Sequence, residues 1–140
     1  MRLYLDTSAA AKLVVLEPES SALVAYCNDD AVILVSTDLL ETELRRTAIR
    51  QGIAQQTVTG VLDRVTLHDI PRNLYAEAGL LAGPALRTLD AIHIAGAIRL
   101  DVDAALIYDK RMREAAVDLG LHVHAPGDGT WVPASTQTQS

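Results

Sequence analysis

Aromatic residues are scarce in this chain of 140 residues, which contains no Phe, four Tyr and one Trp. The core must therefore consist mainly of Ala, Leu, Val and Ile side chains. The scarcity also argues against a protein that stacks single-stranded nucleic acid on exposed rings. The one cysteine, Cys27, excludes an internal disulfide and favours a reducing compartment.

Long apolar runs are also absent, since none approaches the roughly 18–20 residues that a membrane-spanning helix needs. The chain opens on a strand-like run without a signal-peptide pattern, so we expect a cytoplasmic protein with no membrane partner. The net charge of −6 argues against indiscriminate coating of nucleic acid. It is compatible with a nuclease, because acids at a metal site contribute to the total while arginines elsewhere form a local basic rim.

Short apolar runs alternate with helical patterns over most of the chain. The predicted strands span 3–5, 32–35, 65–68, 104–108 and 122–124. The predicted helices span 6–16, 20–27, 54–64, 72–81, 88–100 and 109–119, and another runs from an N-cap at Ser36, Thr37 or Asp38 to Gln51, before Gly52. This alternation predicts one domain over residues 1–126, an α/β sandwich with a mostly parallel sheet. Residues 127–140, rich in small polar residues around Trp131, are predicted to form a loose tail.

Two aspartates stand where a predicted strand gives way to a helix. Asp6 follows the first strand, and Asp109 follows the strand that ends at residue 108. As N-caps they would stabilise their helices by about 1 kcal/mol each. In parallel sheets, however, ligands bind beyond the carboxyl ends of the strands near a topological switch point. Both residues are therefore candidates for one shared site.

Asp90 lies in an unusually apolar first helical turn, next to Leu89 and Ile92. Thr88 is the predicted N-cap, so Asp90 is not needed for capping. A carboxylate among apolar neighbours loses hydration energy unless it is paired or bound to a metal. Asp90 is therefore a third candidate.

Glu43 is the least certain member from periodicity alone. Glu41 and Glu43 flank the apolar stripe of the helix that ends at Gln51, on opposite sides, so periodicity does not choose between them. A surface ion pair of Glu43 with Arg46 or Arg50 is the competing interpretation. If Glu43 joins the three aspartates, the carboxylates suit a divalent cation of the kind used in phosphoryl chemistry.

Four stretches of the chain resemble a known family in their order and spacing. They are Leu3-Tyr4-Leu5-Asp6-Thr7-Ser8, Ser36 with Glu43-Leu44-Arg45-Arg46, Leu89-Asp90-Ala91-Ile92-His93-Ile94-Ala95, and Tyr108-Asp109-Lys110-Arg111-Met112. With these stretches the sequence resembles the PIN-domain ribonucleases, and within them the VapC-type toxins of bacterial toxin–antitoxin (VapBC) pairs. The likeness extends through about residue 126 and implies a PIN-like α/β/α sandwich.

The resemblance implies a role for each acidic residue. It makes Asp6 and Asp90 the main Mg²⁺ ligands, with Mn²⁺ as a substitute, and it adds Glu43 and Asp109 as further catalytic and metal-binding residues. It thereby selects Glu43 over Glu41. A supporting role falls to the hydroxyl of Thr7 or Ser8. From its place one helical turn after Asp90, His93 is expected to be hydrogen-bonded beneath the site and to support it, with a contact to a ligand or a phosphate as the alternative. One departure is Ile107, which stands where the family often has Thr or Ser, so a hydroxyl contact at that point is in doubt.

Basic residues near these acids in sequence are candidates for contacts with RNA phosphates, although a solvated helix face is the default interpretation for Lys110 and Arg111. The candidates are Arg45, Arg46, Arg87, Lys110 and Arg111. The resemblance further implies an endoribonuclease toxin that cleaves structured RNA such as a tRNA or ribosomal RNA loop. It implies a homodimer that a small VapB-type antitoxin inhibits by covering the acidic groove, in a toxin–antitoxin hetero-oligomer.

Three other functions compete with this one. A receiver domain needs an acidic pair after the first strand and an acceptor aspartate after a central one, but Asp6 stands alone and Val35-Ser36 replaces the acceptor. A haloacid-type phosphatase needs Asp-x-Asp, and Ser8 stands in place of the second acid. A catalytically weak or inactive PIN-like module that binds RNA or protein is the remaining alternative.

Overall fold

A parallel sheet forms the centre of the protein. The computed structural model describes residues 1–131, and within that range five strands pair in the order β3-β2-β1-β4-β5. They are β1 (Arg2–Leu5), β2 (Ile33–Thr37), β3 (Val65–His68), β4 (Ala104–Leu106) and β5 (Val123–His124). All the pairings are parallel. The predicted α/β fold with a mostly parallel sheet is confirmed.

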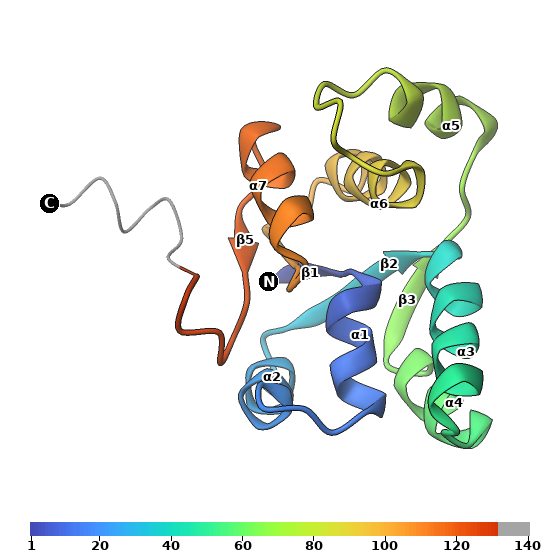
Figure 1. The fold of residues 1–140 in the computed structure, drawn as a ribbon, viewed down its shortest axis with the longest axis vertical. Helices are drawn as coiled ribbons and strands as arrows, with labels where there is room; N and C mark the ends of the chain where they lie inside the picture. Colours follow the sequence, from blue (N-terminus) through green and yellow to red (C-terminus); the bar gives the residue numbers. More distant parts are fainter. Residues whose placement is uncertain (132–140) are drawn as a thin grey trace, which may run out of the picture.

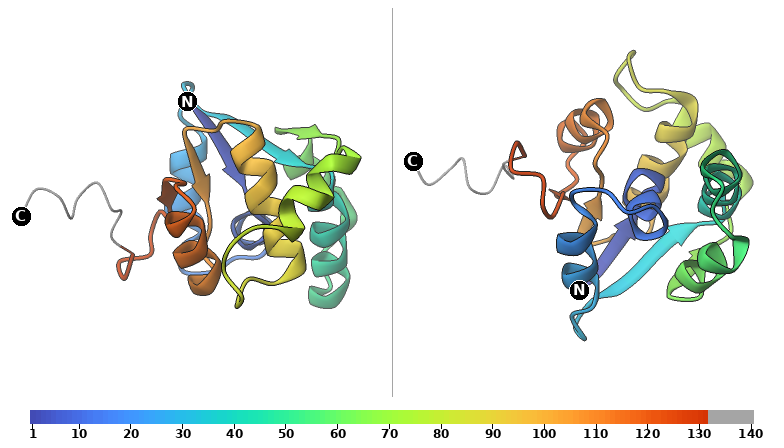
Figure 2. Two further views of the ribbon diagram at one scale, coloured as in Figure 1. Left: turned by 90° about the horizontal axis from the view of Figure 1, so that it is seen from above. Right: turned by 60° about the horizontal axis from the view of Figure 1, so that its bottom comes forward.

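Helices cover both faces of this sheet (Figures 1 and 2). They are α1 (Thr7–Val14), α2 (Ser20–Cys27), α3 (Leu39–Gln51), α4 (Gln55–Leu62), α5 (Arg72–Gly79), α6 (Thr88–Arg99) and α7 (Lys110–Asp118). Side chains of successive strand residues point to opposite faces of a sheet. In β1, Leu3 and Leu5 therefore pack with α1 to α4, whereas Tyr4 packs with α6 and α7. The result is a three-layer α/β/α sandwich.

The strand order places a topological switch point between β1 and β4. From β1 the chain moves outward to β2 and β3, and it then returns to the opposite side of β1 to form β4 and β5. At this point the Asp6 N–H donates to the Leu106 carbonyl over 3.3 Å, and the Tyr108 N–H donates to Ser8 Oγ over 3.0 Å. The residues that follow β1 and β4 are thereby held side by side at the carboxyl edge of the sheet.

Local sequence signals predicted the positions of most helices and strands but misplaced some of their ends. Gly52 ends α3 in the left-handed conformation, with a φ of 69°. The N-cap of α6, however, is Arg87, and Thr88 is its first helical residue. Ser36 and Thr37 belong to β2, which leaves Asp38 as the N-cap of α3. The strand predicted over 104–108 ends at Leu106, because the chain turns toward α7 there.

The beginning of the predicted tail is packed against the domain. Trp131 Nε1 donates to the Val123 carbonyl over 3.0 Å, and the Arg113 guanidinium lies 4.8 Å from the centre of the Trp131 ring. Arg113 also pairs with Asp128 over 2.6 Å. Residues 127–131 are thus part of the packed structure, and the rest of the predicted tail lies outside the described residues. Among residues 1–131, no helix is both long and apolar enough to cross a membrane.

Candidate active site

Asp6 occupies the switch point and is almost fully buried. Its side chain is the N-cap of α1, where Oδ2 accepts hydrogen bonds from Ser8 N at 3.1 Å and Ser8 Oγ at 2.5 Å. The residue is 3% exposed. A buried carboxylate needs such donors to offset its lost hydration. Its Oδ1 lies 3.9 Å from His93 Nε2.

Asp90 and Asp109 reach the same region from two different helices. Asp109 caps α7, with its Oδ1 accepting from the Met112 N–H over 2.9 Å. Asp90 lies in the first turn of α6 and is partly buried. Burial raises the pKa of the Asp90 carboxyl, and the charges of Asp6, Asp109 and Glu43 raise it further, although His93 opposes them. The four acids are therefore close enough to sense one another electrostatically.

Glu43 is connected to this group through a buried histidine. Its Oε1 accepts from His93 Nε2 over 2.5 Å and from Thr7 Oγ1 over 2.9 Å. Burial raises the pKa of Glu43, but the bonds to His93 and Thr7 outweigh it and lower the pKa overall. Burial likewise lowers the pKa of His93, yet its hydrogen bond to Glu43 and the nearby charges raise it to about 10. A positively charged imidazole beneath the acids offsets part of their mutual repulsion.

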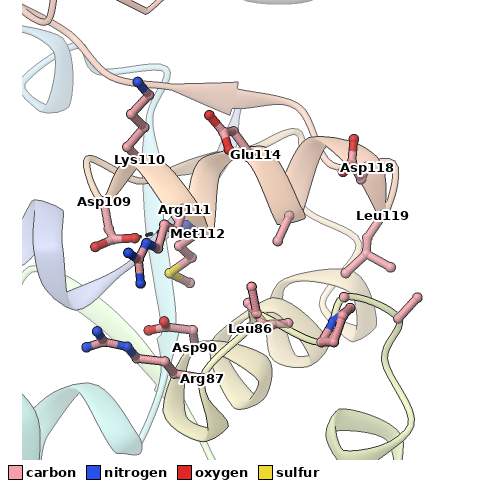
Figure 3. A pocket seen from close by; sticks show the side chains of 15 residues that line it. Leu86, Arg87, Asp90, Asp109, Lys110, Arg111, Met112, Glu114, Asp118 and Leu119 are labelled. Carbon is pink, nitrogen blue, oxygen red and sulfur yellow. Dashed lines mark hydrogen bonds between the residues drawn. The ribbon is translucent and has the colours of Figure 1, made fainter.

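Two of the acids, Asp90 and Asp109, face a cleft between α6 and α7. The cleft has a volume of about 730 Å³, and its walls include Arg87, Asp90, Asp109 and Arg111. Figure 3 shows the two aspartates on opposite walls, with the guanidinium groups of Arg87 and Arg111 beside them. The rest of the lining is largely apolar, with Leu86 and Met112 among its side chains.

The carboxylates are not already arranged as a closed metal cage. Among the residues that the structure describes, no three acidic, histidine or cysteine side chains lie close enough to surround an ion. Asp6 and Asp109 each use one oxygen in a cap, and Glu43 uses one for His93. Each of these side chains has a second oxygen. The donor set consists of carboxylate oxygens, which is the chemistry that Mg²⁺ and Mn²⁺ prefer.

The predicted basic contacts divide into two groups. Arg87, Lys110 and Arg111 line the cleft, although Lys110 extends away from the two aspartates (Figure 3). Arg45 is directed elsewhere, because its guanidinium bonds Glu41, Gln55 and Thr59 between α3 and α4. Arg46 is exposed on α3 and is not part of the cleft wall. The structure therefore brings three of the five predicted cations to the cleft.

Glu43 and Glu41 differ clearly in their partners. Glu41 pairs with Arg45 on the exposed side of α3, whereas Glu43 faces His93 and Thr7. The competing surface pair of Glu43 with Arg46 or Arg50 is not formed, and Arg50 bonds Thr47 instead. The metal-binding role of Glu43 stays a prediction.

Sequence reasoning missed Tyr4, whose hydroxyl lies 2.7 Å from His93 Nδ1 and 3.1 Å from Thr37 Oγ1. A tyrosine in a strand covered on both faces requires a hydrogen-bond partner, and that requirement was the available signal. Ile107 is 1% exposed and packs in the core with Tyr4. The hydroxyl that contacts Asp6 comes from Ser8.

Sequence comparison identifies related proteins over most of the chain. The family model of the PIN domain matches residues 3–118. Ribonuclease VapC46 of Mycobacterium tuberculosis is 42% identical over 127 residues, which cover 89% of this chain and 97% of that protein. Ribonuclease VapC35 of the same species is 39% identical over 134 residues, with the same coverage of each protein.

Solved structures share the fold at much lower identity. Mycobacterium tuberculosis VapC20, a sarcin–ricin loop cleaving toxin, has a TM-score of 0.69 at 16% identity, with 89% of this chain and 99% of that chain covered. VapBC2 from Rickettsia felis, bound to a DNA fragment from its promoter, has a TM-score of 0.66 at 14% identity, with 90% and 99% covered. Together with the sequence matches, these findings show that the chain belongs to the PIN-domain family and, within it, to the VapC ribonucleases.

Proposed function

We propose that this VapC-type ribonuclease is a Mg²⁺-dependent endoribonuclease that cleaves structured RNA as the toxin of a toxin–antitoxin pair. The observation that carries the proposal is the convergence of Asp6, Asp90 and Asp109 from three elements at the switch point of the sheet. The raised pKa of Asp90 reports this convergence, because Asp6 and Asp109 are among its causes. Acids that served only as helix caps would have no reason to gather at one point on the edge of the sheet.

The donor set fits Mg²⁺, with Mn²⁺ as a substitute. We assign Asp6 and Asp90 as the main ligands, with Asp109 and Glu43 completing the set. Burial raises the pKa of Asp90, and repulsion from Asp6, Asp109 and Glu43 raises it further, so a bound divalent cation would stabilise the carboxylate against both effects. When bound, the ion supplies positive charge for the scissile phosphate and lowers the pKa of a water ligand.

The protein's own side chains would hold and orient the RNA. Arg87 and Arg111 flank the two aspartates in the cleft and are suited to charge-assisted bonds with phosphate oxygens (Figure 3). Ser8 holds Asp6 from below through two hydrogen bonds. Thr7 does the same for Glu43. These hydroxyls limit the movement of the Asp6 and Glu43 carboxylates.

The dimensions of the cleft favour an unpaired stretch of RNA over a duplex. A volume of about 730 Å³ is within the range of sites that hold one small organic molecule. Unstacked loop nucleotides of a tRNA or ribosomal RNA can enter such a space, whereas an A-form helix cannot. The relatives named VapC, and the neighbouring structure of a VapBC complex, support a VapB-type antitoxin as the partner. A homodimer within a toxin–antitoxin hetero-oligomer is the assembly that we expect.

The proposal is tested by expressing the protein with and without a small partner encoded next to it. Wild-type protein alone is expected to arrest growth and to produce new RNA ends, and co-expression of the antitoxin is expected to prevent both effects. The Asp6→Asn variant should leave growth and RNA intact at equal expression. In purified form, wild-type cleavage should require Mg²⁺ or Mn²⁺ and stop in chelator. Equal toxicity of the two versions would contradict the nuclease mechanism.

A further inference from the structure

A buried chain of hydrogen bonds connects the middle of the sheet to Glu43. It begins at Thr37 Oγ1 in β2, passes to the Tyr4 hydroxyl in β1 over 3.1 Å, and continues to His93 Nδ1 in α6 over 2.7 Å. From there His93 Nε2 contacts Glu43 Oε1 in α3 over 2.5 Å. The first three residues are nearly inaccessible, with exposed fractions of 2%, 1% and 1%.

The burial of His93 decides what the histidine can do. Both of its ring nitrogens are engaged within the protein, so no nitrogen is free to contact a phosphate or a water in the cleft. Its ring also packs edge-on against the Tyr4 ring, with 5.7 Å between centroids and 74° between planes. A ring held by a hydrogen bond at each end has one orientation. His93 is therefore suited to holding another side chain in place, not to contacting the substrate.

These hydrogen bonds fix the orientation of the Glu43 side chain. The hydrogen bonds from His93 and Thr7 both go to Oε1, which leaves Oε2 as the oxygen that can serve the reaction. Glu43 comes from α3, on the opposite side of the sheet from α6. A flexible glutamate on a partly exposed helix face would otherwise sample several rotamers. The bonds to Oε1 select one of them.

Gly96 allows α6 to approach the sheet as closely as this chain of hydrogen bonds requires. A Cβ atom at Gly96 would lie 2.7 Å from Thr37 Cγ2 and 3.4 Å from the Tyr4 hydroxyl. Because glycine has no Cβ, α6 can approach β1 and β2 until His93 meets Tyr4. By contrast, a Cβ at Gly60 in α4 would meet nothing within 4 Å.

We propose that Thr37, Tyr4 and His93 form a relay of hydrogen bonds that positions Glu43. The absence of a Cβ atom at Gly96 lets α6 approach the sheet closely enough for this relay to form. The inference rests on the proposed ribonuclease function and adds positioning residues to it. None of the relay residues touches RNA or the metal. Their effect on cleavage passes entirely through the orientation of Glu43.

The test compares Tyr4→Phe with Tyr26→Phe as a matched control, because the protein contains a second tyrosine–histidine pair. Tyr26 contacts His124 Nδ1 over 3.3 Å in another part of the molecule. We expect Tyr4→Phe to lower kcat about tenfold at unchanged KM for RNA, because it misplaces a reacting group without removing a binding contact. Tyr26→Phe should retain the wild-type kcat. Both rates are measured well below the melting temperature of each variant.

A double-mutant cycle separates positioning from general damage to the fold. In a Glu43→Gln background, Tyr4→Phe should cause no further loss of kcat, because the relay then has no carboxylate to hold. Gly96→Ala should lower kcat as Tyr4→Phe does, while Gly60→Ala should not. A wild-type kcat for folded Tyr4→Phe, or losses from Tyr4→Phe and Glu43→Gln that simply multiply, would overturn the relay.

A second measurement needs no activity and no metal. In the metal-free protein, the His93 Nδ1–H proton should exchange slowly with water, because the ring is 1% exposed and this nitrogen contacts the Tyr4 hydroxyl over 2.7 Å. Proton NMR should detect this protection in wild type and in Tyr26→Phe, and its loss in Tyr4→Phe. Equal protection in all three proteins would contradict the relay. Failure of the wild type to cleave any RNA would instead refute the proposed function, and it would be seen without any variant.

Discussion

Acids follow parallel strands at two places on the same edge of this sheet, and only one place has the features of a site. Beside β1 and β4, Asp6 is 3% exposed and is joined by acids from α3, α6 and α7. Beside β2 and β3, Asp38 and Asp69 are exposed. There the pKa of Asp38 is raised by partial burial and then by the hydrogen bond and charge of Asp69.

The difference between these two regions lies in the topology. Between β1 and β4 the strand order reverses, so the chain leaves the two strands in opposite directions and opens a space that α6 and α7 border. Between β2 and β3 the order continues without reversal, and the Asp38 N–H bonds the His68 carbonyl over 2.9 Å to close the edge. An acid at a strand end is therefore not enough for a site. It must also stand at the switch point and meet acids from helices.

The largest expected difference is between removing two carboxylate charges at the switch point and removing two between β2 and β3. Asp6→Asn with Asp90→Asn should lower the rate of RNA cleavage by at least about 10³-fold, because it removes both of the main metal ligands that we propose. Asp38→Asn with Asp69→Asn should change the rate less than about threefold. Single-turnover cleavage with saturating Mg²⁺ measures both. Comparable losses in the two double variants would remove the distinction between the regions.

A smaller effect is expected from the two glutamates of α3. Glu43→Gln should lower kcat by about 10- to 100-fold, because it weakens the hydrogen bond to His93 and removes a negative charge from the acidic group. Glu41→Gln should leave kcat unchanged and cost less than about 0.5 kcal/mol of stability, since Glu41 forms only an exposed pair with Arg45. Steady-state kinetics and thermal melting of the two variants test this. A matching loss of kcat in Glu41→Gln would count against the assignment of Glu43.

The smallest effect concerns stability without metal. The raised pKa values of Asp90 and Asp38 mean that the folded state holds each carboxylate less favourably than the unfolded state does. This penalty is present above the folded-state pKa and disappears as the pH falls below the ordinary value of about 3.9. In chelator at pH 7, Asp90→Asn should raise Tm by a few degrees and Asp38→Asn by less, because solvent screens the exposed Asp38 carboxylate. Both gains should shrink toward pH 4. The gain in Tm from Mg²⁺ should be lost only in Asp90→Asn.

Local sequence signals predicted the positions of the elements and the two strand-end aspartates. Apolar runs fix where strands lie, and an aspartate between a strand and a helix is recognisable as a cap, as Asp6 and Asp109 prove to be. The carboxyl ends of parallel strands share one edge, so convergence of these two followed from the fold class. For Glu43 and Asp90, which lie within helices, the fold class alone did not predict that they would join the site.

What the sequence left open depends on contacts between distant elements. Glu41 and Glu43 are equivalent by periodicity, and the rotation of α3 against α6 separates them. Tyr4 and His93 lie 89 residues apart, so only the packed structure reveals their bond. The same holds for Trp131, whose composition-based assignment to a loose tail overlooked its partner Arg113. Tertiary contacts override local pattern at each of these residues.

The most direct test of the central claim is calorimetric titration of the purified protein with Mn²⁺, in the absence of RNA. We predict saturable binding to the wild type and to the Asp38→Asn, Asp69→Asn variant, and no detectable binding to the Asp6→Asn, Asp90→Asn variant. Circular dichroism should show the same folded content in all three. Equal Mn²⁺ affinity of the three proteins would contradict a metal site at the switch point.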